Sequence, residues 1–337
     1  MHSRVVASAD SSTYHGLENK LQMSGFLKFI RRPPSASEER DWERENIRSK
    51  TERYLQTNPM DRFETDEPWR AKVLAIEAAL SGIAGLTLDI GGNTAGEATV
   101  LSQRGVRIVV SHINEYALDV SRQRVRKFGL KSPWFIACDA HHLPFADASF
   151  SAVTVIEALH HFSDYGHALR EIHRILKPGG RLYSTEPNAL NPLRRLSEVR
   201  DRLRGTIEKS FTVGQLKHLC VDAGFAKVDI RPFAIGRSSW KLKEVPLYRR
   251  PLAQFHGWLA VNVPRFFAGH AITAVKAGIL DADSLSEPFT QFRCPKNGEP
   301  LRLDPATGRW SGGAGGWSYP DLDGIPVLIA EDAKAIG

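Results

Sequence analysis

A glycine-rich turn after the apolar run Leu86–Ile90 carries residue types that could cradle a charged ligand. The run includes Asp89, and Gly91, Gly92 and Asn93 follow it. Glycine lets the backbone turn sharply and approach a ligand, and asparagine also tolerates a positive φ. The turn lacks the G-x-G-x-x-G spacing of a dinucleotide site. Taken alone, it predicts a tight strand-to-helix connection that either binds a ligand or is purely structural.

A second group of residues could bind a metal or move a proton. Its members are histidines and a glutamate that flank later apolar runs: His141, His142, Glu157, His160 and His161. They lack the i, i+4 helical spacing of a zinc hydrolase. We therefore predict no metal site in this group.

The elements that must position these residues alternate in type along the chain. Short apolar runs predict strands at Leu86–Ile90, Arg107–Ser111, Trp134–Cys138, Ala152–Ile156, Arg181–Thr185, Lys227–Arg231 and Ala271–Lys276. Helical patterns lie between them at Glu97–Arg104, Glu115–Phe128, Tyr165–Leu176 and Val213–Ala223. This alternation predicts an α/β fold, a doubly wound, seven-stranded and mostly parallel sheet, with ligands at the carboxyl ends of its strands.

Two longer phrases are more specific than the glycine turn. CDAHHLPFADASFSAVTVIEALHHF spans 138–162, and EIHRILKPGGRLYSTEPN spans 171–188. With the LDIGGN phrase upstream, they resemble the class I S-adenosylmethionine-dependent methyltransferases, of the methyltransferase type 11 kind. The resemblance implies S-adenosylmethionine as cofactor and a Rossmann-like fold. It places Asp89, Gly91, Gly92 and Asn93 under the amino acid part of the cofactor. It places Asp139 and the backbone at Ala140 beside the adenine.

The end of the second predicted strand departs from that family. The family usually has an acidic residue there that accepts hydrogen bonds from both ribose hydroxyls, whereas this chain has His112 followed by Ile113. An imidazole cannot accept both bonds, and the lost charge-assisted contacts are worth roughly 1.5–3 kcal/mol. We expect weaker cofactor binding unless Asn114 or Glu115 compensates.

Catalysis by methyl transfer depends largely on positioning, and a general base is needed only when the acceptor must lose a proton. By the resemblance, Glu157 ends the fourth strand, contributes to the cofactor site and borders the substrate mouth. His160 and His161 lie next to it and are, with Glu157, the candidate bases. The alternative, that these residues simply line the pocket, is favoured.

Three regions are predicted along the chain: a partly helical N-terminal arm (1–70), the methyltransferase domain (71–280) and a small β module (289–332). The last resembles the zinc-ribbon-like activator subunit of methyltransferases, through Cys294-Pro295 and the Tyr319–Leu328 phrase. It lacks the other zinc cysteines, and one thiolate cannot hold zinc. We predict a metal-free module that packs in cis on the methyltransferase domain. The expected core residues are Leu301, Leu303, Trp310, Trp317, Val327 and Leu328.

Composition and charge limit the possible partners. The 337 residues have a net charge of +7, and 181–250 carries the whole excess. An acidic ligand or RNA could bind there, although an ordinary solvated surface explains the charge equally well. The stretch 252–280 is interrupted by polar residues, so we expect core and surface segments; peripheral membrane contact there is an alternative that the sequence does not favour. Three separated cysteines and no apolar signal core favour a cytoplasmic location.

The sequence thus favours methyl transfer to a small molecule, a lipid headgroup or a saccharide. A methyltransferase-like scaffold or binding protein without catalysis is one alternative, supported by His112. Methylation of RNA or protein is another, but the Asn/Asp-Pro-Pro-Tyr phrase is missing and Thr185–Asn188 does not replace it.

Overall fold

The computed structural model describes residues 36–203, 209–234, 247, 250–280, 292–313 and 316–336. The first 35 residues of the predicted arm, residues 281–291 and part of the basic stretch 181–250 lie outside these ranges.

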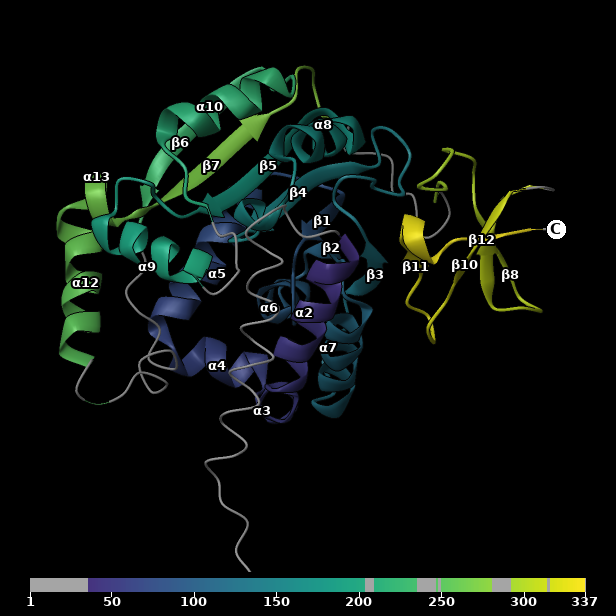
Figure 1. Cartoon of the computed structure of the whole chain (residues 1–337), viewed down its shortest axis with the longest axis horizontal. Coiled ribbons are helices and arrows are strands. Elements are labelled where there is room, and N and C mark those ends of the chain that lie inside the picture. The colour runs from purple at the N-terminus through teal and green to yellow at the C-terminus, as the bar shows by residue number, and fades with distance from the viewer. Residues whose placement is uncertain are drawn as a thin grey trace, which may run out of the picture.

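The described residues form a main sheet of eight strands (Figure 1). Its strands are β1 (Leu86–Ile90), β2 (Arg107–His112), β3 (Trp134–Cys138), β4 (Phe150–Ile156), β5 (Leu176–Glu186), β6 (Lys227–Phe233), β7 (Gly269–Val275) and β11 (Val327–Leu328). The spatial order is β11-β3-β2-β1-β4-β5-β7-β6. β7 pairs antiparallel with both β5 and β6, and the remaining pairs are parallel. The doubly wound, mostly parallel fold predicted from sequence is confirmed.

Helices cover both faces of this sheet. The helices are α2 (Ala36–Arg48), α3 (Thr51–Gln56), α4 (Pro59–Thr65), α5 (Glu67–Leu80), α6 (Gly96–Gln103), α7 (Glu115–Lys127), α8 (Tyr165–Ile175), α9 (Pro192–Leu203), α10 (Val213–Asp222), α12 (Arg250–Asn262) and α13 (Pro264–Phe267). One core cluster joins α5, α6 and α7 to one face of the sheet, and the other joins α8 and α10 to the opposite face. Neighbouring residues of a strand point to opposite faces, so a strand buried on both sides becomes apolar throughout.

The chain changes direction across the sheet between β1 and β4. From β1 it continues to β2 and β3 on one side, and from β4 to β5 on the other. The two strands run parallel side by side, with Asp89 opposite Thr154. Such a switch point leaves a crevice at the carboxyl ends of the strands, because the connections lead away in opposite directions.

The C-terminal segment forms a small antiparallel sheet in the order β12-β10-β9-β8. These strands are β8 (Arg302–Asp304), β9 (Arg309–Ser311), β10 (Trp317–Pro320) and β12 (Lys334–Ala335). The segment also contributes β11, which pairs with β3 as the eighth strand of the main sheet. Seven strands were expected, and this one was missed because two residues show no periodicity. The Phe292 ring lies against Phe145 of the main body and Trp310 of the small sheet, with centroids 5.8 and 4.9 Å away.

Most of the expected core residues of this segment are buried, but Leu303 is not. Leu303 is 44% exposed because β8 lies at the edge of the small sheet. Tyr319, fully buried, occupies the centre instead, and its Oη lies 3.2 Å from the Sγ of Cys294. Across the described part of the chain, no group of three or more His, Cys, Asp or Glu side chains is arranged to hold a metal ion.

Candidate active site

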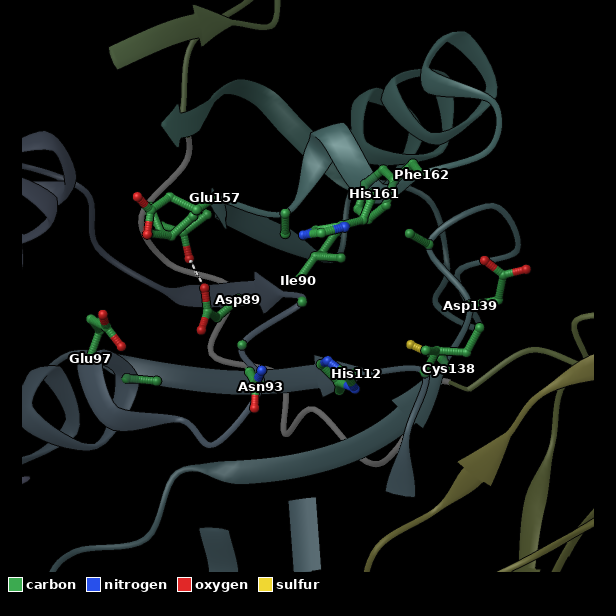
Figure 2. A pocket seen from close by; sticks show the side chains of 18 of the residues that line it. Asp89, Ile90, Asn93, Glu97, His112, Cys138, Asp139, Glu157, His161 and Phe162 are labelled. Carbon is green, nitrogen blue, oxygen red and sulfur yellow. Dashed lines mark hydrogen bonds between the residues drawn. The ribbon is translucent and has the colours of Figure 1, made fainter. Parts of the chain in front are cut away.

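A cavity of about 320 Å³ opens at the carboxyl ends of β1, β2, β3 and β4 (Figure 2). Its volume lies within the range of small-molecule sites. The predicted cofactor-site residues all line it, as does His161: Asp89, Gly91, Gly92, Asn93, His112, Ile113, Asp139, Ala140, Glu157 and His161. We call this space the strand-end cavity. In Figure 2 the labelled side chains follow its length, from Glu97 and Glu157 at one end, past Asp89 and His112, to Cys138 and Asp139 at the other.

The glycine turn after β1 forms the floor of the cavity because its backbone admits no side chains. Gly91 has a φ of +73°, and a Cβ there would lie 2.6 Å from the Cβ of Ala158. A Cβ on Gly92 would lie 2.6 Å from Oδ2 of Asp89. Asn93 adopts a φ of 43°, which asparagine accepts more readily than most residues. The turn therefore brings backbone close to the β4 loop and to the Asp89 carboxylate.

Asp89 is the most deeply buried carboxylate on the cavity floor, with 7% of its surface exposed. Its Oδ1 accepts a 2.7 Å hydrogen bond from Oγ1 of Thr154, on the neighbouring strand β4. Burial raises the pKa of Asp89 to about 7, the Thr154 bond opposes the rise, and the negative charge of Glu97 adds to it. A cationic ligand group beside Asp89 would stabilise its ionised form.

A lysine joins two further carboxylates at the same end. Nζ of Lys72, from α5, lies 3.1 Å from Oε1 of Glu97 and 3.0 Å from Oε2 of Glu157. Burial acts against both charged states, but the mutual attraction lowers the pKa of Glu97 to about 2 and raises that of Lys72. With Asp89 ionised, this end of the cavity is lined by three acidic side chains and one lysine. Arg62 and Arg124 also act on Glu97 from outside the lining, so Asp89 is the carboxylate best placed to attract a cation.

His112 has a defined hydrogen-bonding role at the end of β2. Its Nδ1 accepts a 2.9 Å hydrogen bond from the backbone N–H of Asn114, so the neutral ring carries its proton on Nε2. The Asn114 side chain accepts from the backbone N–H of Tyr116 and caps α7. Glu115 forms an ion pair with Arg44. Neither Asn114 nor Glu115 is among the residues that line the cavity, so neither compensates there for the missing carboxylate.

Asp139 follows β3 at the far end of the cavity and is held by the turn after it. Its Oδ1 accepts bonds from the backbone N–H and from Nδ1 of His141, at 2.9 and 2.7 Å. Nε2 of His141 accepts from the backbone N–H of Asp164, which places the ring proton on Nδ1. Burial raises the pKa of Asp139, but the His141 bonds outweigh it and lower the pKa overall. The carboxylate is therefore ionised and fixed in position.

The three candidate bases occupy different environments. His161 lines the cavity, and Glu157 lines it while paired with Lys72. His160 is the predicted site residue that does not line the cavity. It is buried, with Nδ1 2.8 Å from Oε2 of Glu186 at the end of β5. Its ring lies 4.2 Å from the ring of His161, centroid to centroid.

Glu186 organises this corner of the site, although its role there was not predicted from the sequence. Its carboxylate accepts the backbone N–H groups of Leu159 and His160, at 3.0 and 3.2 Å, in addition to the His160 ring. Burial raises its pKa, and His160 acts in the opposite direction. The pair fixes the short helical turn 159–161, which carries His161.

Three more cavity residues were missed in the sequence. Glu97 was detectable as the first acidic residue after the glycine turn. Lys72 gave no signal because its helix precedes β1 and its role depends on packing. Thr154 looked like one more residue of a buried strand, and only its register opposite Asp89 reveals the hydrogen bond.

Proteins with a doubly wound sheet bind their ligands in the crevice at the switch point, and the strand-end cavity lies at that position. Within this chain, residues 88–184 match the family described as "Methyltransferase domain". The match covers less than a third of the chain and shows that the part from β1 to β5 is similar to that family.

The chain is also similar to several curated methyltransferases. It is 35% identical over 136 residues to the demethylmenaquinone methyltransferase of Thermus thermophilus, which covers 40% of this chain and 60% of the relative. It is 36% identical over 104 residues to the ubiquinone/menaquinone biosynthesis C-methyltransferase of Klebsiella pneumoniae, covering 29% and 41%. The chain thus spans about 60% or less of the length of these relatives.

Among solved structures, it is similar to the phosphoethanolamine N-methyltransferase 2 of Haemonchus contortus in complex with S-adenosyl-L-methionine. The TM-score is 0.46 and the identity 20%, covering 61% of this chain and 52% of that one.

Proposed function

We propose that this protein binds S-adenosylmethionine in the strand-end cavity and transfers its methyl group to a small-molecule acceptor. The observation that carries the proposal is the arrangement of charged side chains around the glycine turn after β1. Asp89, Glu97 and Glu157 face a ligand there with Lys72 as the cation among them. A ligand with both an ammonium and a sulfonium group suits this surplus of negative charge, because each cation gains attraction in a partly buried site.

The two ends of the cavity suit the two ends of the cofactor. Asp89 and the turn Gly91–Asn93 would hold the amino acid part, with Lys72 available to its carboxylate. Asp139 and the backbone at Ala140 would face the adenine. Bound S-adenosylmethionine supplies a methyl group on a sulfonium, which an acceptor can displace in line, and the protein's contribution is to orient the two reactants.

The ribose would meet His112 rather than a carboxylate. Because Nδ1 already accepts from Asn114, Nε2–H can donate one hydrogen bond to a ribose oxygen. A carboxylate would instead accept from both hydroxyls, through charge-assisted bonds worth roughly 1.5–3 kcal/mol. The proposal therefore includes an affinity below that of a methyltransferase with an acidic residue at this position.

The acceptor would approach beside Glu157, His161 and Phe162, which border the same cavity. His161 and Glu157 are the side chains that could take a proton from an acceptor. His160 acts as a positioning residue, since its Glu186 contact holds the turn that carries His161. The similarity to methyltransferases named for demethylmenaquinone and ubiquinone supports a lipophilic small molecule as the acceptor class.

The C-terminal module is part of this proposal as a metal-free support for the adenine side. Its strand β11 pairs with β3, which carries Cys138 and leads into Asp139. The backbone N–H of Ala137 also donates to Pro326 O at 2.8 Å. The module therefore braces the strand whose end would contact the adenine, a role similar to that of an activator subunit within one chain.

Isothermal titration calorimetry of the full chain with S-adenosylmethionine, S-adenosylhomocysteine and ATP tests the cofactor. We expect binding of the first two at micromolar concentration and none of ATP. At pH 8, His112→Asp should bind S-adenosylmethionine about tenfold more tightly, since it restores both ribose acceptors. Absence of binding below millimolar concentration would refute the enzyme and favour the scaffold alternative. Transfer of labelled methyl to demethylmenaquinone then tests the acceptor separately.

A further inference from the structure

Helix α12 exposes large apolar side chains instead of burying them. Leu252, Phe255, Trp258 and Val261 are each more than half exposed, and Trp258 is 56% exposed. The rings of Phe255 and Trp258 stack with centroids 5.9 Å apart and planes within 10°. The stretch was expected to provide core and surface segments. Isolated exposed apolar residues are common on protein surfaces, but a row along one helix marks an interaction site.

The apolar surface continues onto neighbouring helices. Val263 and Phe266 extend it through α13, and Leu193 and Leu196 of α9 are exposed as well. The side chains of Asn188 and Asn191 donate to the carbonyl oxygens of Arg265 and Phe267, at 3.0 and 3.3 Å, so the turn that leads into α9 is held to α13. In Figure 1 the three helices lie together at the end of the molecule farthest from β8–β12. We call the exposed apolar side chains of α9, α12 and α13 the apolar end.

The charged residues of α12 and α13 have one sign. Between Glu244 and Asp281 the sequence has no acidic residue, and it has four basic ones, of which Arg250 and Arg265 flank α12. In α9, the Arg195 side chain is 59% exposed, whereas its partner Glu198 is nearly buried. Aromatic and aliphatic side chains edged by arginine form the pattern of a helix that lies in the interface of an anionic bilayer.

A second copy of the chain fits this surface poorly. A symmetric contact would place the same patch on both subunits and bring the basic residues of one copy close to those of the other, while neither α12 nor α13 has an acidic residue to face them. An anionic lipid surface is complementary to this basic sequence and accepts apolar side chains at the same time. Within the described residues, no helix has the length and apolar character needed to cross a membrane, and the 13 residues of α12 measure only about 20 Å.

We propose that the apolar end docks the protein on an anionic lipid bilayer, with α12 lying in the plane of the interface. The apolar end also lies near the carboxyl end of β5, because Asn188 follows β5 directly and binds Arg265. Glu186, which holds His160, ends the same strand. Docking would therefore bring the part of the strand-end cavity beside Glu157 and His161, where the acceptor would approach, toward the lipid.

Flotation of the full chain with vesicles tests the proposal without requiring methyl transfer. We expect flotation with equal parts of phosphatidylcholine and phosphatidylglycerol, and little with phosphatidylcholine alone or at high salt. In the double variant Phe255→Ser/Trp258→Ser, each substitution should lower the partition coefficient of the protein into the vesicles about tenfold. Arg250→Gln/Arg265→Gln should lose the preference for the anionic vesicles. Leu303→Ser/Leu322→Ser is the matched control, because both leucines are exposed in the C-terminal segment, and it should float like wild type.

Binding of S-adenosylmethionine serves as the folding control, since neither Phe255 nor Trp258 lines the cavity. The proposal is overturned if wild type does not float with anionic vesicles, or if the serine double variant floats equally well. It is also overturned if light scattering shows that this variant only converts a dimer into a monomer, which would assign the surface to a second copy. Failure of flotation with intact cofactor binding would leave the proposed enzyme standing, so the two failures are distinguishable.

Discussion

Asp89→Asn would remove one negative charge from the strand-end cavity while nearly preserving the shape of the side chain. The amide oxygen of asparagine can still accept the hydrogen bond of Thr154, which holds Asp89 at 2.7 Å. The substitution thus separates the charge of Asp89 from its structural role. We expect it to weaken S-adenosylmethionine binding and to alter the dependence of that binding on pH.

The size of the effect comes from the raised pKa of Asp89, about 7. With that pKa, about a tenth of the unliganded protein is ionised at Asp89 at pH 6, and about nine tenths at pH 8. If the ionised form is the one that binds the ligand's ammonium, the association constant rises about tenfold between these values. At pH 8 Asp89→Asn should lose a charge-assisted bond worth roughly 1.5–3 kcal/mol, or about ten- to a hundredfold in affinity.

The same raised pKa has a consequence for folding. Because the pKa of Asp89 in the folded protein lies above its unfolded value of about 3.9, folding favours the protonated carboxyl. Its contribution to the stability of the unliganded protein is fully present below about pH 4 and is lost as the pH rises through about 7. A cationic ligand reverses this loss by pairing with the carboxylate.

Calorimetry at pH 6, 7 and 8, in two buffers of different ionisation enthalpy, measures both affinity and proton release. The α-amino group of the ligand itself loses charge toward pH 8, so the ratio of wild-type to Asp89→Asn affinity is the quantity to follow. We expect this ratio to rise about tenfold from pH 6 to 8, with release of about one proton by wild type at pH 6. A ratio that stays constant would refute the assignment of Asp89 to the ammonium.

Two further substitutions test the turn and the C-terminal module. Gly91→Ala should abolish most cofactor binding, because its Cβ would lie 2.6 Å from the Cβ of Ala158. Gly82 is the control, because it also has a φ near +75° but no atom lies within 4 Å of the position of its Cβ. Gly82→Ala should therefore lower the free energy of unfolding by only about 1–2 kcal/mol. Calorimetry and urea unfolding distinguish the two, and equal cofactor affinities would contradict the prediction. Phe292→Ala should lower the free energy of unfolding by about 3–5 kcal/mol, and the exposed Leu303→Ala by less than about 0.5 kcal/mol. A wild-type urea midpoint for Phe292→Ala would show that the module does not stabilise the main sheet.

The sequence predicted the strands of the main sheet well because buried parallel strands form apolar runs with clear ends. The bounds of β1 and β3 agree with the predicted ones residue for residue. Periodicity could not reveal β11, whose two residues gain their role only by pairing with β3. Lys72 was equally invisible, because its contact with Glu157 joins residues that are 85 positions apart. Likewise, only the backbone bond from Asn114 fixes which nitrogen of His112 carries the proton.

The histidine at position 112 becomes understandable once the charges of the cavity are considered together. Glu97 already helps to raise the pKa of Asp89, and Lys72 is shared between Glu97 and Glu157. A carboxylate at the end of β2 would add another negative group near Asp89, and like charges in a partly buried site disfavour ionisation. The imidazole of His112 offers one donor in place of both ribose acceptors but leaves Asp89 able to ionise near neutral pH. The departure from the family pattern is therefore compatible with cofactor binding. The site loses hydrogen bonds to the ribose, but Asp89 keeps the negative charge that would attract the ammonium group.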